Sequence, residues 1–195
     1  MGRVVLITGL QAAGKTTVGR LLAQRLPAPS ASLDGDVFFD MVATGKAVMT
    51  PSPSEEAERQ LRLRYEASAL VARHYVRGGF DFVVSDIIIG PYVATWMDSI
   101  ADAERHLVVL APSLDAVFER DRARGQGSYR DWQEPGESLA DAVAKLGAGL
   151  DDMPRSGLWL DTSDDTPEET VERILADGMR SSLYDPAPAA ARGTH

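Results

Sequence analysis

Residues 9–16 read Gly9-Leu10-Gln11-Ala12-Ala13-Gly14-Lys15-Thr16, a stretch framed by glycines that ends in a lysine and a threonine. It follows the apolar run Arg3 to Thr8 and precedes a helical pattern, the setting that the motif G-x-x-x-x-G-K-[ST] requires. The glycines let the backbone curl so that successive N–H groups point at phosphate oxygens, and the helix start adds partial positive charge. The stretch therefore predicts a phosphate-binding loop after the first strand.

This loop is expected to form one end of a nucleotide site. Lys15 is expected to reach the β- and γ-phosphates, and the Thr16 hydroxyl is expected to bind Mg²⁺. The alternative is a glycine-rich turn with an exposed lysine, but a chance match arises in roughly one such chain in several hundred. The residues expected to hold ATP here are Gly9, Leu10, Gln11, Ala12, Ala13, Gly14, Lys15, Thr16 and Thr17.

Outward from the loop, five short apolar runs alternate with longer helical patterns, which predicts a parallel sheet covered by helices on both faces. The expected strands are Arg3–Thr8, Ala31–Asp34, Asp81–Ser85, His106–Ala111 and Gly157–Asp161. The expected helices run from Lys15 to Leu26, from Ser54 to Gly78, from Ser113 to Arg124 and from Ser138 to about Leu150, and a last helix opens with a capping box at Thr166.

The composition limits the class of protein. A chain of 195 residues with 44% apolar and 25% charged residues fits one domain. It has no cysteine and only scattered histidines, so thiolate chemistry and a histidine metal cluster are not expected, and without asparagine it lacks the guanine-reading Asn-Lys-x-Asp motif. The formal charge of −9, without a basic block or a long apolar run, argues against nucleic acid and membrane partners and favours a cytoplasmic protein. No pattern indicates an oligomeric state.

Aspartates lie where two of the predicted strands end. Asp86 follows the third strand and is expected to hold Mg²⁺ directly or through water, or else to cap a following helix. Asp34 and Asp36 end the second strand, and a spacing of two in an extended chain places both carboxylates on one side. We expect Asp36 to accept a proton from a substrate hydroxyl and Asp34 to lie on the metal side, the alternative being a plain Asp-Gly turn. Asp40 and Asp86 are further candidates for contact with the substrate.

Arginines gather before and within the polar stretch 125–136, which is expected to be a surface loop. Arg120 and Arg124 are four residues apart on one helix face, a placement suited to gripping phosphates or stacking on adenine while the loop closes. Such closure excludes water and so protects ATP from hydrolysis. The alternative is a solvated, charged helix face.

These segments resemble the small P-loop kinases, among them chloramphenicol phosphotransferase, gluconate kinase, shikimate kinase and adenylylsulfate kinase. The matching segments are GLQAAGKTT, LDGD, VVSD, FERDRARG and LWLDTSDDTPEETV, which span about residues 3–177. The resemblance is strongest to chloramphenicol phosphotransferase-like proteins, from which Asp36 takes the role of catalytic base by position.

The resemblance implies a P-loop NTPase three-layer α/β/α sandwich, with five parallel strands in the order 2-3-1-4-5 and a lid at about residues 120–137. It also implies that adenine lies between the lid arginines and the loop after Asp161, where Thr162 and Ser163 would contact it. We expect one domain over residues 1–184 and a flexible C-terminal tail over 185–195.

The resemblance places the acceptor pocket between helices over Val37–Met49 and Glu55–Arg77. Aromatic and apolar side chains in and near these helices favour a partly apolar acceptor, although each also suits a plain core position. They are Phe38, Phe39, Met41, Tyr65, Tyr92 and Trp96.

The leading hypothesis is an ATP-dependent transfer of the γ-phosphoryl group to a hydroxyl of a small molecule. Asp36 would deprotonate that hydroxyl, while Lys15, Mg²⁺, Arg120 and Arg124 stabilise the charge on the transferring group. A nucleotide or nucleoside kinase is the first alternative, and it predicts arginines for a second phosphate, with Arg59, Arg62, Arg64 and Arg73 as candidates. The second alternative is an ATPase module without an acceptor.

Overall fold

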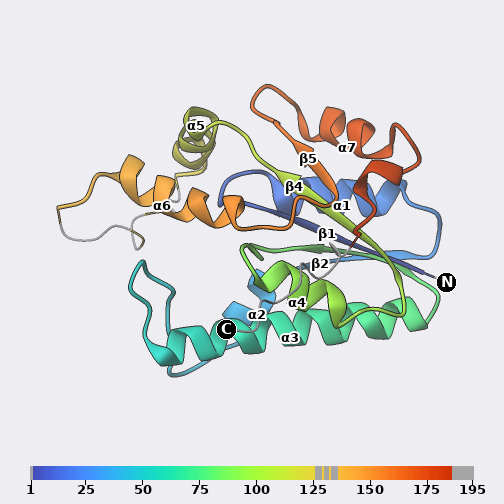
Figure 1. Ribbon diagram of the computed structural model, residues 1–195, viewed down its shortest axis with the longest axis horizontal. Coiled ribbons are helices and arrows are strands. Elements are labelled where there is room, and N and C mark those ends of the chain that lie inside the picture. Colours follow the sequence, from blue (N-terminus) through green and yellow to red (C-terminus); the bar gives the residue numbers. More distant parts are fainter. Residues whose placement is uncertain (1, 126–128, 130–131, 133–135, 186–195) are drawn as a thin grey trace, which may run out of the picture.

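Five parallel strands form one sheet in the spatial order β2-β3-β1-β4-β5 of the computed structural model (Figure 1). The strands are β1 (Arg3–Gly9), β2 (Ser30–Asp34), β3 (Asp81–Ser85), β4 (Glu104–Leu110) and β5 (Leu158–Leu160). The strand order and the common direction confirm the predicted fold class. The structure describes residues 2–125, 129, 132 and 136–185, so much of the expected lid (126–128, 130–131 and 133–135) and the expected tail from residue 186 onward lie outside the described residues.

Helices cover both faces of the sheet. Helices α1 and α7 pack on one face and α3 and α4 on the other, while α5 and α6 lie beyond the end of β1 where the phosphate-binding loop begins (Figure 1). The helices are α1 (Lys15–Arg25), α2 (Asp36–Asp40), α3 (Glu55–Arg77), α4 (Tyr92–Asp98), α5 (Leu114–Arg124), α6 (Leu139–Asp151) and α7 (Pro167–Leu175).

Strand β1 is buried on both sides because it occupies the centre of the sheet. Val4 and Leu6 face the core under α3 and α4, whereas Val5 and Ile7 face the core under α1 and α7. Successive side chains of a strand point to opposite faces, so an uninterrupted apolar run is what a doubly covered strand needs. Packing on both faces of the sheet therefore fixes the position of Gly9, where β1 ends.

The predicted helix starts are built as capping motifs. The hydroxyls of Ser54, Ser113 and Ser138 each accept a hydrogen bond from a backbone N–H three residues later. At Thr166 the hydroxyl and the Glu169 carboxylate exchange bonds with each other's backbone N–H groups, which confirms the predicted capping box.

Two segments differ from the sequence-based expectation. The helix expected over Val37–Met49 is wrong, because only Asp36–Asp40 is helical and Gly45 adopts a left-handed φ of 70°. Val37 and Met41 are exposed, so no buried apolar face holds a longer helix together. Conversely, α4 was not expected, although Val93, Trp96 and Met97 form its buried face at helical spacing.

None of the helices in the described part of the chain combines the length and the apolar character needed to cross a membrane.

Candidate active site

The phosphate-binding loop leaves β1 in a conformation that depends on its glycines. A Cβ atom on Gly9 would stand 2.3 Å from the carbonyl oxygen of Leu110, and Gly14 caps α1 with a φ of 95°. Neither position tolerates a side chain without strain. Among the described residues, the backbone N–H groups of Ala12 and Gly14 have no hydrogen-bond acceptor. The loop therefore carries backbone donors that suit phosphate oxygens.

Lys15 lies over this loop, and its Nζ is 2.8 Å from the carbonyl oxygen of Leu10. One residue on, the Thr16 hydroxyl donates to Oδ2 of Asp34 at 2.8 Å. The first turn of α1 therefore touches the end of β2. This contact places the hydroxyl and the carboxylate that were expected on the metal side within one hydrogen bond of each other.

Asp86 is buried at the end of β3 beside the loop. Its Oδ1 accepts from the Ile87 N–H at 2.7 Å and from Arg64 at 3.3 Å, whereas its Oδ2 has no partner among the described residues. Burial raises the pKa of Asp86, against the opposing effect of the Arg64 guanidinium, and the negative charge of Asp36 raises it further. No helix begins at Ile87, since α4 starts only at Tyr92, so the helix-cap alternative does not describe Asp86.

Asp36 stands at the start of α2, exposed to solvent. The expected arrangement of Asp34 and Asp36 along an extended strand is wrong, because Gly35 is helical in conformation (φ −62°, ψ −23°) and turns the chain between them. The Asp36 N–H donates to Oδ1 of Asp34 at 3.1 Å. A tight turn rather than strand geometry therefore brings the two aspartates together, and Asp36 lies close enough to Asp86 to raise its pKa.

Of the other residues expected to contact the substrate, Tyr65 borders the aspartate cluster, whereas Asp40 and Phe39 have partners outside it. Asp40 is exposed and pairs with Lys46 at 3.4 Å, and the Lys46 ammonium lies 4.2 Å from the ring centre of Phe39. Tyr65 is buried and donates from its hydroxyl to the carbonyl of Ile87, directly after Asp86. Tyr65 therefore borders the site, whereas Phe39 and Asp40 end α2 and contact Lys46 of the loop that follows it.

Arg64 lies in the site, although the sequence offered it only as one of four arginines for a second phosphate and gave no reason to prefer it. Of the α3 arginines weighed for a second phosphate, Arg59 and Arg62 form exposed pairs with glutamates of their own helix, whereas Arg64 reaches Asp86 and is mostly buried. Its Nε is buried without a partner among the described residues. The available signal was periodicity, because Arg64 falls on the same helical stripe as Leu61 and Ser68, which pack inward.

Arg120 lies on the side of the site formed by the loop after β5. Its guanidinium donates to the carbonyl oxygens of Thr162 at 2.5 Å and Ser163 at 3.1 Å. The Thr162 hydroxyl is buried without a partner among the described residues, whereas the Ser163 hydroxyl bonds to Asp161. This arrangement brings together the three residues expected around adenine. The side chain of Arg124 lies outside the described part of the structure.

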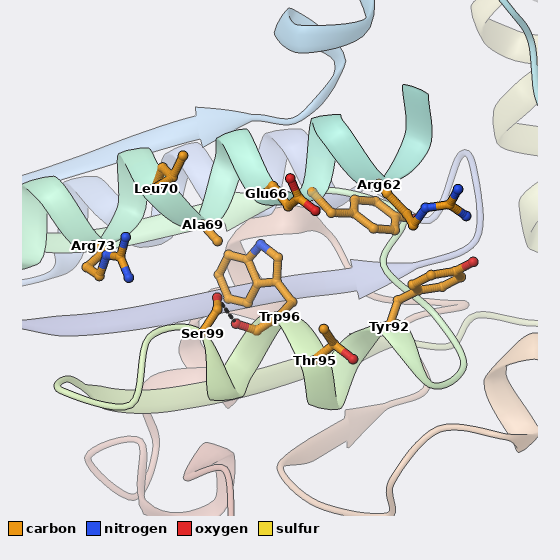
Figure 2. Close-up of a pocket in the computed structure, with 10 residues that line it drawn as sticks. Arg62, Glu66, Ala69, Leu70, Arg73, Tyr92, Thr95, Trp96 and Ser99 are labelled. Carbon is orange, nitrogen blue, oxygen red and sulfur yellow. Dashed lines mark hydrogen bonds between the residues drawn. The ribbon is translucent and has the colours of Figure 1, made fainter. Parts of the chain in front are cut away.

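A groove of about 510 Å³ runs between α3 and α4 (Figure 2). Trp96 lies across its middle, with Tyr92 at one end and Arg73 at the other (Figure 2). Tyr65, Tyr92 and Trp96, three of the expected acceptor-lining residues, all border this groove. Met41, also expected there, is instead 69% exposed.

The parallel sheet and the glycine-framed loop after β1 place the chain in the class of P-loop proteins. The chain belongs to the AAA_33 family of AAA domains, whose model matches residues 4–148.

Comparison with individual proteins agrees with this class. An adenylyl-sulfate kinase from Chloroflexus aurantiacus is 34% identical over 124 residues, and this chain covers 61% of that relative's length while 62% of this chain is matched. An unliganded sugar kinase from a Janibacter species has a TM-score of 0.61 at 16% identity, covering 90% of this chain and 94% of that one. An APS kinase from Mycobacterium tuberculosis, solved with AMPPNP and APS, has a TM-score of 0.57 at 21% identity, covering 90% and 96%.

Proposed function

We propose that the chain is an ATP-dependent O-phosphotransferase that moves the γ-phosphoryl group to a hydroxyl of a small molecule. The observation that carries the proposal is the position of Asp36, a solvent-accessible carboxylate beside Asp86 and one turn from the Thr16–Asp34 contact of the phosphate loop. Similarity to proteins named as an adenylyl-sulfate kinase and a sugar kinase supports a small-molecule acceptor.

In the proposed step, the acceptor oxygen forms a bond to the γ-phosphorus while the bond from that phosphorus to the bridging β-oxygen breaks, and ADP leaves. The hydroxyl proton passes to the Asp36 carboxylate. Lys15, whose Nζ already lies over the loop, exchanges the Leu10 carbonyl for phosphate oxygens and stabilises their charge. Arg120 donates to two carbonyl oxygens of the loop after β5 and so orients the part of the site proposed to hold adenine.

The oxygen ligands at the loop suit Mg²⁺, which prefers hard oxygen donors and is held through few protein ligands. The donors are the Thr16 hydroxyl and the carboxylates of Asp34 and Asp86, and the buried Oδ2 of Asp86 has no partner among the described residues. Bound there, Mg²⁺ neutralises charge on the β- and γ-phosphates.

The body of the acceptor is proposed to lie in the groove between α3 and α4. Tyr65 joins the groove to the site, because it borders the groove and its hydroxyl bonds to the residue after Asp86. A cavity of this size accepts a drug-sized molecule, and Trp96, Ala69 and Leu70 give it an apolar lining. The proposed acceptor is therefore a partly apolar alcohol. The proposed setting is the cytoplasm, with neither a nucleic acid nor a membrane surface as a partner.

Arg64 favours one alternative acceptor class. Its buried guanidinium beside Asp86 suits an anionic group, as on a nucleoside monophosphate. A nucleotide kinase is therefore kept as the second candidate.

One experiment separates these readings. ADP release is measured with panels of neutral alcohols, nucleosides and nucleoside monophosphates, and without acceptor, for the native chain, Asp36→Asn and Arg64→Gln. The proposal expects acceptor-dependent turnover with neutral alcohols that falls about 10²- to 10⁴-fold in Asp36→Asn. Turnover confined to monophosphates and lost in Arg64→Gln selects the nucleotide kinase, and equal turnover in all samples selects an ATPase.

A further inference from the structure

Tyr129 reaches the phosphate-binding loop from the segment that follows α5. Only 1% of the residue is exposed, and its ring packs edge-on against Phe118 with centroids 6.4 Å apart. Its hydroxyl donates to the backbone carbonyl of Gln11 at 2.6 Å. A residue distant in sequence therefore bonds directly to the backbone of the loop.

This hydrogen bond fixes the orientation of one peptide unit. A peptide is planar and trans, so the carbonyl of Gln11 and the N–H of Ala12 point in opposite directions. Because Tyr129 holds that carbonyl on its own side, the Ala12 N–H is turned to the other side of the loop. Within residues 2–125, 129, 132 and 136–185, this N–H has no acceptor. It is a free donor in the element that would bind phosphate.

The same peptide needs outside support. Ala12 has a φ of 62°, a left-handed conformation that is unfavourable for a residue with a Cβ atom and persists only where the surroundings hold it. Two side-chain donors hold neighbouring carbonyls of this turn, Lys15 on Leu10 and Tyr129 on Gln11. If Lys15 moves to the phosphates during catalysis, Tyr129 is the donor that stays.

The surroundings suit Tyr129 to this task. The ring lies in an apolar cluster with Leu10, Ala12, Val117 and Val143, which joins the loop to α5 and α6. Burial, together with the negative charge of Asp121, raises the pKa of Tyr129, so the hydroxyl stays protonated and remains a donor.

We propose that Tyr129 is a positioning residue of the nucleotide site: its hydroxyl orients the Gln11–Ala12 peptide so that the Ala12 N–H faces the β- and γ-phosphates. The inference rests on the proposed function, since it assumes that the loop binds a nucleotide. It predicts that the hydroxyl acts on phosphate binding alone and has no effect on the nucleoside part.

The test compares Tyr129→Phe, which keeps the ring and its packing, with the native chain. Affinity for ADP and for adenosine is measured by calorimetry, or by competition where binding is weak, and the melting temperature is recorded for each protein. Tyr75→Phe serves as the matched control, because Tyr75 is a partly exposed tyrosine of α3 that packs on Phe80 and Phe82, far from the loop.

The expected result is an ADP affinity lower on the order of tenfold in Tyr129→Phe, the size of one hydrogen bond to a charged group, with unchanged adenosine affinity. In steady state, KM for ATP should rise more than kcat falls. Unchanged ADP affinity overturns the inference, and so does an equal loss for ADP and adenosine, which would assign Tyr129 a general structural role. If the native chain binds neither ADP nor ATP, the proposed function itself fails.

Discussion

The α-carbon of Gly35 lies directly against the carboxylate of Asp86, so that a Cβ atom on Gly35 would stand 2.1 Å from Oδ2 and 2.2 Å from Cγ. The turn between Asp34 and Asp36 therefore closes over the carboxylate proposed to face the metal. Glycine is required here for space alone, because its φ of −62° is open to any residue.

Gly35→Ala should displace Asp86 and separate it from the phosphate loop. We expect a loss of about 1–3 kcal/mol in the free energy of unfolding, as for overpacked sites, and weaker binding of ADP in the presence of Mg²⁺. Urea unfolding and ADP titrations with Mg²⁺ or EDTA measure both effects.

Gly147→Ala is the matched control for that substitution. Gly147 lies inside α6, and the nearest atom to its added methyl group is Leu10 Cδ1 at 4.0 Å. The Gly147→Ala substitution should raise the free energy of unfolding by up to about 1 kcal/mol, because alanine has the higher helix propensity. A Gly35→Ala protein as stable as the native chain, with native binding, would contradict the packing described here.

Thr16→Val should remove the Mg²⁺-dependent part of ADP affinity, because it deletes the hydroxyl that contacts Asp34 while keeping the shape of the side chain. Thr16→Ser keeps the hydroxyl and should stay close to the native chain. The expected difference is about 10- to 100-fold, as for other metal-site groups. Equal Mg²⁺ dependence in the two variants would exclude Thr16 from the metal site.

Stabilisation of the protein by Mg²⁺ and ADP should grow as pH rises. The pKa of Asp86 is raised above its ordinary value of 3.8, so its contribution to the stability of the fold alone is complete below that value and is lost as pH rises through the raised pKa. Mg²⁺ would bind the ionised carboxylate of Asp86 and would compensate for its buried negative charge. The increase in melting temperature on adding both should therefore be larger at about pH 8 than at about pH 5. A pH-independent increase would argue against Asp86 as a metal ligand.

Leu70→Glu should raise KM for a partly apolar acceptor with little change in kcat. Leu70 lines the groove and is 56% exposed, so the substitution adds charge to the proposed binding surface without opening the core. Leu63→Glu is the control, since Leu63 is 49% exposed on the same helix but does not line the groove. If both variants raise KM equally, the effect is one of surface charge and the acceptor lies elsewhere.

The fold was predictable because strong local signals agreed with each other. Apolar runs such as Val4 to Ile7 have the length and uniformity of strands buried on both faces, and Thr166 to Glu169 specifies a helix start by itself. The stretch after Asp36 carried no such agreement, because apolar residues such as Val37 and Met41 stay exposed and the chain turns at Gly45 with a φ of 70°. The helix expected there was therefore wrong.

Residues of the candidate site could be predicted where a sequence motif marks them. They could not be predicted where they are brought in by contacts between distant segments. Residues 9–16 predict a phosphate loop, the strand ends predict Asp34, Asp36 and Asp86 beside it, and the structure brings these residues together. The packing of Gly35 on Asp86 and the bond from Tyr129 to Gln11 join segments 51 and 118 positions apart, and no local pattern encodes them. Only the folded chain shows which of several arginines, here Arg64, reaches the buried carboxylate.

The most direct test of the central claim follows the phosphorus itself. ATP labelled in the γ-phosphoryl group is incubated with the protein and with the alcohol that gives the highest turnover, and the label is located by mass spectrometry. The proposal predicts label on the acceptor oxygen with the native chain, and almost none with Asp36→Asn even though ADP still binds. Label found only in inorganic phosphate, or on the acceptor to the same extent with Asp36→Asn, would contradict it.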